Sequence, residues 1–260
     1  MRDKKPFKKQ FRKNNNFNRR DRNQQQENIE EKKWEPKTNL GKKVIEGKYG
    51  SIFEVVKSGE KIMETEITDF LEPNINMEFV NIGQAKGKFG GGKRKTSKST
   101  QKITREGGKM SFSMCALTGN KNGVVGLGFG KAKETVPSRE KCIKKAKQNL
   151  IIIRRGCGDW GCFCGTSHSI PYEVVGKSGS VTVKLIPAPK GTGLIVENEL
   201  KKMLELAGIK DIWSKTYGNR KNKTNLMRAG FDALKQLQRI KVNPLVAEGR
   251  GIKEGDKNEY

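Results

Sequence analysis

Three cysteines and the only histidine of this 260-residue chain lie within residues 157–168. Their spacing is Cys157-x4-Cys162-x-Cys164-x3-His168, and the glycines between and beside them would let the loop fold back on itself. Structural Zn²⁺ sites take four such thiolate and imidazole ligands. The sequence leaves two interpretations open: one structural zinc ion held by these four side chains, or small packed thiols beside a hydrogen-bonded or RNA-contacting His168.

The same residue types argue against an enzyme. A zinc deaminase needs a glutamate beside the zinc-bound histidine, whereas His168 is followed by Ser169 and Ile170. With His168 as the chain's single histidine, the sequence also offers no Ser/His/Asp catalytic set. The glycines at positions 126, 128 and 130 are too closely spaced for a dinucleotide-binding loop, and there is no Walker loop. We therefore expect a protein without catalytic activity.

Charge is the strongest compositional signal. The chain has 54 Lys+Arg against 28 Asp+Glu, a net charge of +26, and only 33% hydrophobic residues. So large a charge repels itself in a compact monomer, which favours a polyanionic partner such as RNA. No window has the apolar length of a membrane span or the form of a secretory signal, so we expect a cytoplasmic protein.

Two basic segments stand out. Residues 1–33 are a low-complexity mixture of Lys, Arg, Asn and Gln, which predicts a disordered arm that lies along RNA phosphates. Gly83–Lys109 combines glycines with basic residues and is expected to be a flexible RNA-binding loop that ends in a tight turn at Gly107-Gly108. The RNA-binding residues predicted here are Lys86, Lys88, Lys93, Arg94, Lys95, Lys98, Lys102, Arg105, Gly107, Gly108 and Lys109.

The surrounding sequence predicts one small α+β unit before the cysteines. Residues 110–118 alternate like a half-buried strand, 119–123 form a hairpin turn, and 124–130 return as a second strand. A helix is expected from Pro137 to about residue 153, with Cys142 on its apolar face and Cys115 in the core. Upstream, we expect a short helix over 51–57 and mixed extended and loop structure over 62–79.

A second α+β unit is expected after the cysteines. A strand with alternating Val181, Val183 and Leu185 precedes a helix that stops at Gly208. A short strand over 209–216 and a last helix capped by Thr224 follow. From residue 243 onward we expect a polar, frayed tail.

Four strings then point to a family: VGLGFGKAKE, RRGCGDWGCFCGTSHSIP, GKSGSVTVKLIPAPKGTGL and LAGIKDIWSKTYGNRKNKTN. Together they resemble the ribosomal protein S5 family in its archaeal form, whose eukaryotic relative is called S2. The resemblance runs from Trp34 to about residue 237, and WEPKTNLGKKVIEG resembles the start of the archaeal and eukaryotic members.

The resemblance implies an α+β protein with an N-terminal domain like a double-stranded-RNA-binding domain and a β-α-β C-terminal domain. It implies binding to 16S-type rRNA, contact with ribosomal proteins S4 and S3, a place along the channel through which mRNA enters, and support of decoding accuracy. It transfers RNA-contact roles to the Gly107-Gly108-Lys109 turn, the glycine strand with its basic pair, and the joint. The residues it adds are Gly126, Gly128, Gly130, Lys131, Lys133, Arg154 and Arg155, to which Lys184 and Lys190 join as further basic candidates.

The predicted organisation is therefore an arm over 1–33, an archaeal-type extension over 34–75, the first domain over 76–155, a Cys/His-rich joint over 156–172, the C-terminal domain over 173–240 and a polar tail over 241–260. The function that follows is a structural constituent of the small ribosomal subunit. The alternative is a free RNA-binding or RNA-chaperone module with the same fold, which would bind assorted RNAs with a steep salt dependence.

Overall fold

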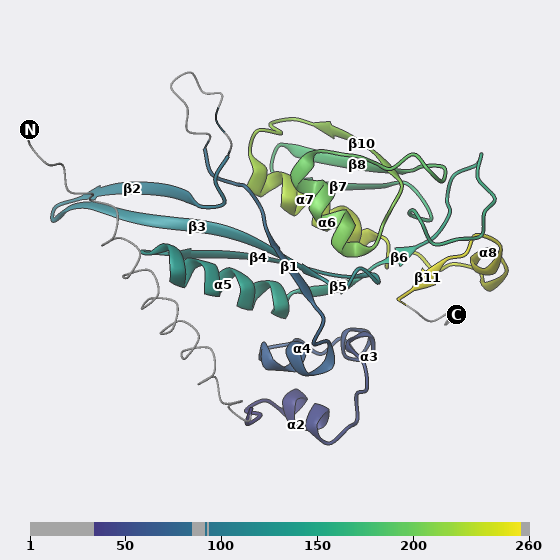
Figure 1. Ribbon diagram of the computed structural model, residues 1–260, viewed down its shortest axis with the longest axis horizontal. Coiled ribbons are helices and arrows are strands. Elements are labelled where there is room, and N and C mark those ends of the chain that lie inside the picture. Colours follow the sequence, from purple (N-terminus) through teal and green to yellow (C-terminus); the bar gives the residue numbers. More distant parts are fainter. Residues whose placement is uncertain (1–33, 85–91, 93, 256–260) are drawn as a thin grey trace, which may run out of the picture. The chain divides into compact units, whose positions relative to one another are not determined.

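The computed structural model describes residues 34–84, 92 and 94–255 (Figure 1). Residues 38–255 belong to one compact unit. The predicted arm over 1–33, the lysines 86, 88 and 93 and the last five residues lie outside the described part of the chain.

Three short helices form the extension that precedes the first sheet: α2 (Asn39–Ile45), α3 (Ile52–Lys57) and α4 (Glu66–Leu71). The helix expected over 51–57 is thereby confirmed, whereas the expectation of no helix between 62 and 79 is wrong. Helix α4 contacts α5 (Thr135–Gln148), the helix that packs on the first sheet. Thr68 Oγ1 donates to Lys147 O at 3.2 Å, and Lys147 pairs with Asp69. The extension is thus docked against the first α+β half.

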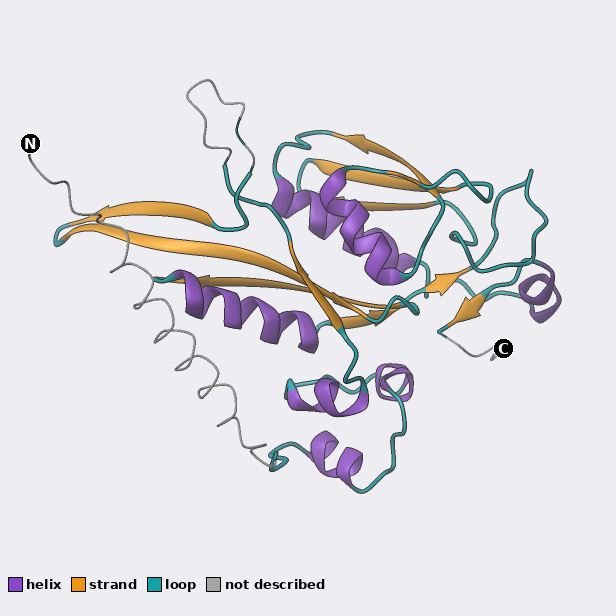
Figure 2. Ribbon diagram, in the orientation of Figure 1, coloured by secondary structure: helices purple, strands orange, loops and turns teal. Residues whose placement is uncertain are grey.

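The first sheet contains β1 (Asn76–Phe79), β2 (Lys98–Thr104), β3 (Gly107–Gly119), β4 (Val124–Ala132) and β5 (Leu150–Ile152). Its order is β1-β3-β4-β5, and β2 pairs with the far end of β3. Helix α5 (Thr135–Gln148) covers one face (Figure 2). Two expectations are corrected here: α5 ends before β5, where consecutive isoleucines favour a strand, and the supposed flexible loop contains β2.

The second sheet has the order β7-β8-β10-β9, formed by β7 (Val174–Ser178), β8 (Val181–Pro187), β10 (Ile212–Tyr217) and β9 (Leu194–Ile195). Strands β9 and β10 are parallel and flank α6 (Asn198–Ala207), which gives the predicted β-α-β connection. Helix α7 (Lys223–Gln236) packs on β7 and β8. Its N-cap is Asn222 in place of the predicted Thr224, and strand β7 was not predicted.

One hydrophobic core joins the two halves. It combines Leu117 and Leu127 of the first sheet with Met203 of α6 and Leu234 of α7, all buried. The β3–β4 turn also contacts the end of α6, because Lys121 N donates to Leu206 O at 2.9 Å and Gly123 N donates to Ala207 O at 3.0 Å. The α+β class is confirmed, and the two halves share their core.

Residues 244–254 include a helix and a strand where a frayed tail was expected. Helix α8 (Pro244–Gly249) starts at the Asn243 N-cap, and β11 (Lys253–Glu254) pairs with β6 (Arg154–Arg155). Pro at the first helical position and an Asn cap are favourable signals at a helix start. Across the described residues, no helix has both the length and the apolarity needed to span a membrane.

Candidate functional site

The register of the first sheet brings several predicted lysines onto one face. Strand β3 runs past the end of β4, so β2 and the first part of β3 form a projecting two-stranded ribbon (Figure 1). Lys102 lies opposite Lys109, and Ser113 lies opposite both Lys98 in β2 and Lys131 in β4. Residues paired across strands share a face, and every second residue along a strand returns to it.

We call this face the lysine face, defined by Lys98, Lys102 and Lys109 of the ribbon and Lys131 of β4. All four side chains are exposed. Met114 and Ala116 pack against α5 on one face of the sheet, and the lysine face is the other one. Lys109 forms an ion pair with the exposed Glu106 at 2.7 Å. The predicted Lys95, Arg105, Gly107, Gly108, Lys133 and Lys190 are exposed as well. The geometry suits a surface that meets phosphates at several points at once.

The three glycines of β4 are buried, so the structure gives them a packing role, and their predicted contact with RNA stays a prediction. A Cβ on Gly128 would lie 2.1 Å from Cys142 O, and one on Gly130 would lie 2.2 Å from Ser138 O. A Cβ on Gly126 would likewise lie 2.3 Å from Ala146 O. These glycines let α5 lie directly on the strand, so their close neighbour is a helix of the same chain.

The arginines of the joint are also explained by packing. Arg154 pairs with Glu254, and Arg155, which is buried, donates to Lys121 O at 3.3 Å and to Gly255 O at 3.1 Å. Both therefore fasten the C-terminal strand, and their contact with RNA stays a prediction. Lys184 is partly engaged too, in a 2.5 Å ion pair with Glu173.

The fold also forms a basic pocket that the sequence did not predict. Arg94 meets Arg220, Lys221 and Lys223 around Leu226, and Arg94 Nη1 lies 3.4 Å from Lys221 O. Lys223 is bound to Glu197 at 2.5 Å, while Arg220 and Lys221 are exposed. The run of basic residues at 220–223 could have signalled this pocket, but only the fold brings Arg94 to it.

The cysteines and the histidine lie in a loop that is closed at its base. Gly156 and Ser169 form an isolated antiparallel bridge, with Gly156 N to Ser169 O at 2.9 Å and Ser169 N to Gly156 O at 3.0 Å. Gly158 packs so tightly on the returning chain that a Cβ there would lie 2.2 Å from Pro171 O. The residues from Cys157 to His168 therefore form a compact loop between β6 and β7.

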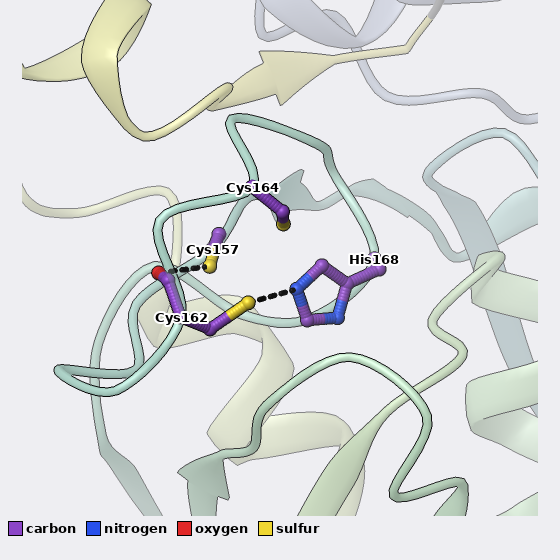
Figure 3. Close-up of side chains that lie close together, drawn as sticks. All are labelled: Cys157, Cys162, Cys164 and His168. Atoms are coloured by element: carbon purple, nitrogen blue, oxygen red, sulfur yellow. Dashed lines mark hydrogen bonds between the residues drawn. The ribbon is translucent and has the colours of Figure 1, made fainter.

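The four predicted ligands face one another inside this loop (Figure 3). Their ligand atoms all lie within 4.8 Å of one another, and Cys162 Sγ is 3.8 Å from His168 Nε2. A tetrahedral zinc ion with bonds of about 2.0–2.3 Å would hold its ligand atoms about 3.3–3.8 Å apart. The cluster needs only a small contraction to reach that geometry, so these residues fit a metal ion.

Two thiols of the cluster differ in acidity. Burial raises the pKa of Cys157 to about 11, with Cys162 and Cys164 contributing to the rise. The hydrogen bond from Thr166 lowers the pKa of Cys164 to about 6, and their side-chain atoms are 3.0 Å apart. Because thiolates bind metals, Cys164 is prepared to coordinate at neutral pH, while Cys157 would have to lose its proton on binding.

His168 is oriented by the second half of the molecule. Its Nδ1 lies 2.9 Å from Asp211 Oδ2 within a buried pair, although the ring N–H is not aimed straight at that oxygen. The backbone oxygen of His168 accepts from Lys210 N at 2.8 Å and from Asp211 N at 3.1 Å. The two remaining cysteines, Cys115 and Cys142, are buried in the core as predicted.

Comparison with known proteins gives the class. Residues 96–154 match the family described as "Ribosomal protein S5, N-terminal domain", and residues 176–250 match "Ribosomal protein S5, C-terminal domain". The two α+β halves are thus those of a ribosomal protein. The chain belongs to the ribosomal protein S5 family and is of the archaeal type, which confirms the resemblance seen in the sequence.

Relatives cover nearly the whole chain. The "Small ribosomal subunit protein uS5" of Nanoarchaeum equitans is 46% identical over 228 residues, which are 88% of this chain and 97% of the relative. That of Methanobrevibacter smithii is 44% identical over 226 residues, 87% of this chain and 98% of the relative. Membership of a family of structural ribosomal proteins confirms the expectation that the chain is not an enzyme.

Proposed function

We propose that this protein is a structural constituent of the small ribosomal subunit in the cytoplasm and binds 16S-type rRNA through the lysine face. The names of its relatives and its family support the place in the subunit. The observation that carries the binding surface is the register, which aligns three exposed lysines of the projecting ribbon with Lys131 of β4 on one face. The basic pocket at Arg94 and the exposed Lys133 and Lys190 extend the surface available to phosphates.

A neutralised lysine face tests this. In the variant Lys98→Gln/Lys102→Gln/Lys109→Gln/Lys131→Gln, affinity for a 16S-type rRNA fragment should fall, and the slope of log affinity on log salt should decrease by about three. The matched control replaces Lys141, Lys144, Lys145 and Lys201 by Gln, the same charge change on helices α5 and α6. An equal loss in both variants would show that net charge alone binds RNA and would contradict a defined surface.

A sedimentation measurement separates this proposal from a free RNA-binding module. Tagged protein should migrate with small subunits in a sucrose gradient and stay there in moderate salt. Protein found only in the free fractions, with similar affinity for unrelated RNAs, would favour the free module. The family membership makes the ribosomal outcome the expected one.

We further propose that the protein lies along the channel through which mRNA enters, beside ribosomal proteins S4 and S3, and supports decoding accuracy. The family resemblance supports this, and the projecting ribbon provides a basic surface that could reach beyond the protein's own core. Compared with unmodified subunits, subunits that carry the neutralised lysine face should lose more translation rate on structured mRNAs than on unstructured ones. An equal change for both mRNA classes would count against this placement.

We also propose that Cys157, Cys162, Cys164 and His168 hold one structural Zn²⁺ ion. The mutual approach of the four ligand atoms and the closed loop base support it. Purified protein should contain about one zinc per chain, and Cys164→Ser should lose it, while Cys142→Ala, which changes a core cysteine, should keep it. If reduced protein that was supplied with zinc contains none, the cysteines are packed thiols and not metal ligands.

A further inference from the structure

We propose that Asp211 is a positioning residue of the metal site. It holds His168 so that Nε2 faces the three thiols, and it fastens the loop over residues 157–168, here called the metal loop, to the C-terminal sheet. This inference rests on the proposed zinc site. Asp211 was not among the residues that the sequence singled out, since it lies 43 positions after His168 in the chain. It is a part of the site that only the fold reveals.

The side chains of Asp211 and His168 form a buried pair at the inner end of the loop. They are 7% and 5% exposed, and Asp211 Oδ2 is 2.9 Å from His168 Nδ1. On the other side of the ring, Nε2 lies 3.8 Å from Cys162 Sγ. A neutral imidazole has one N–H. A carboxylate 2.9 Å from Nδ1 favours the proton on that nitrogen, although the ring N–H is not aimed straight at the oxygen, and the lone pair of Nε2 is then left for a metal ion.

The second oxygen of Asp211 is engaged as well, which fixes the carboxylate in place. Asp211 Oδ1 accepts from Gly191 N at 3.1 Å and from Gly193 N at 2.8 Å. Both glycines have positive φ, so this turn presents its amides in a conformation that other residues rarely adopt. Because the same carboxylate contacts the histidine and the turn, it joins a ligand of the metal loop to the segment between β8 and β9.

The backbone makes the same connection from the other direction. The carbonyl of His168 accepts from the amides of Lys210 and Asp211, just before β10 begins at Ile212. His168 is therefore held at its ring and at its peptide by one short segment. A ring held in this way needs little further ordering when the metal binds, so the carboxylate should raise the affinity of the site.

The chain provides a matched control in Asp159. It is a second buried carboxylate, 8% exposed, in the same loop, and its Oδ2 accepts from Gly161 N at 3.2 Å. Replacing Asp159 by Asn removes a carboxylate from the loop but leaves the one that contacts the histidine. Comparing the two variants therefore separates the specific contact from a general effect of charge near the metal.

The experiment measures Zn²⁺ affinity of the full chain by competition with a chromophoric chelator. We expect Asp211→Asn to weaken binding by about 10- to 100-fold, at an unchanged stoichiometry, and Asp159→Asn to change it by less than about 3-fold. Unweakened binding in Asp211→Asn would overturn the inference while leaving the zinc site intact. Failure of the unmodified protein to bind zinc would instead refute the proposed site itself.

A second background distinguishes positioning from a merely structural role. In His168→Cys the fourth ligand is a thiolate without a ring to orient, so adding Asp211→Asn should no longer weaken zinc binding. An equal loss in both backgrounds would show that Asp211 acts through the fold, which contradicts the proposal. Should Asp211→Asn not fold, Asp211→Glu moves the carboxylate by one methylene and permits the same comparison in both backgrounds.

Discussion

At the scale of single residues, the neighbours of each glycine decide what the glycine does. Gly208 ends α6 with φ +79°, and a Cβ there would lie 1.9 Å from Lys121 O in the β3–β4 turn. Gly59 has nearly the same conformation, φ +75°, but a Cβ there would meet nothing within 4 Å. Backbone strain is common to both sites, whereas the steric conflict exists only at Gly208.

We therefore predict that Gly208→Ala lowers the free energy of unfolding much more than Gly59→Ala. The control should cost about 1–2 kcal/mol for the left-handed conformation, and Gly208→Ala should cost about 1–3 kcal/mol beyond that because the β3–β4 turn must move. Urea unfolding of the two variants measures the difference. Equal losses would mean that the turn adjusts freely and does not lock the two halves together.

Glu199 gives a residue-scale prediction that depends on pH. Burial alone would raise the pKa of Glu199, but bonds from Asn81 N at 2.9 Å, Asn81 Nδ2 at 3.0 Å and Lys202 Nζ at 2.9 Å outweigh it and lower the pKa. A lowered acid pKa stabilises the fold at pH values above the unfolded pKa of about 4.3. That stability is lost as the pH falls through the folded pKa.

Glu199→Gln should accordingly destabilise the protein by about 1–3 kcal/mol at neutral pH. The difference from the unmodified protein should shrink as the pH falls below about 4.3. Thermal unfolding at a series of pH values measures it. A difference that stays constant down to strongly acidic pH would rule out the charge of Glu199 as its source.

The sequence predicted residue roles where they depend on local pattern. The burial of Cys115 and Cys142 followed from the apolar faces on which they lie, and the Cys/His cluster followed from spacing within a short loop. The joint arginines were assigned to RNA because their charge was visible and their partner was not. Glu254 lies 100 positions further along the chain from Arg154, and no local signal connects them.

At the scale of elements, alternation and helical periodicity identified β3, β4, β8 and α6. The elements that were missed have weak patterns: β2 is exposed over most of its length, and α8 is six residues long. An exposed ribbon strand needs no buried face, so its sequence resembles that of a basic loop. The pairing with β3, which also creates the lysine face, comes from tertiary structure.

The C-terminal strand depends on a few charged contacts, and this makes a prediction. Glu254 pairs with Arg154, and its side chain is only 10% exposed. Glu254→Gln should lower stability by about 1–3 kcal/mol, because the partly buried Arg154 keeps its charge without a counter-charge. Glu106→Gln removes the exposed partner of Lys109 and should cost less than about 1 kcal/mol.

Hydrogen exchange locates the effect of Glu254→Gln. The amides of β11 and α8 should lose protection while those of β3 and β8 keep theirs. Unchanged exchange at β11 would show that strand pairing with β6, and not the ion pair, holds the C-terminal segment in place.

At the scale of the whole molecule, the shared core makes the two sheets one cooperative body, and the Cys/His loop over residues 157–168 contacts several of its parts. The loop base is bridged at Gly156 and Ser169, Cys157 N donates to Arg250 O at 2.9 Å, and a Cβ on Gly251 would lie 2.0 Å from Gly165 O. The loop thus contacts the segment that follows α8, and His168 contacts the segment before β10. Loss of the loop's structure should therefore destabilise elements outside the loop.

We therefore predict that removing zinc with a chelator lowers the melting temperature of the whole protein and does so in a single transition. At a free zinc concentration one hundred times the dissociation constant, the metal contributes about 2.7 kcal/mol, which disappears on chelation. In hydrogen exchange, protection should fall first in residues 157–168 and in α8, and the core strands should follow only in global unfolding. Cys164→Ser should melt at the temperature of the chelated protein with or without added zinc, whereas Cys142→Ala should still respond to the metal. If chelation leaves the melting temperature unchanged although zinc is removed, the loop folds on its own hydrogen bonds and the metal does not support the fold.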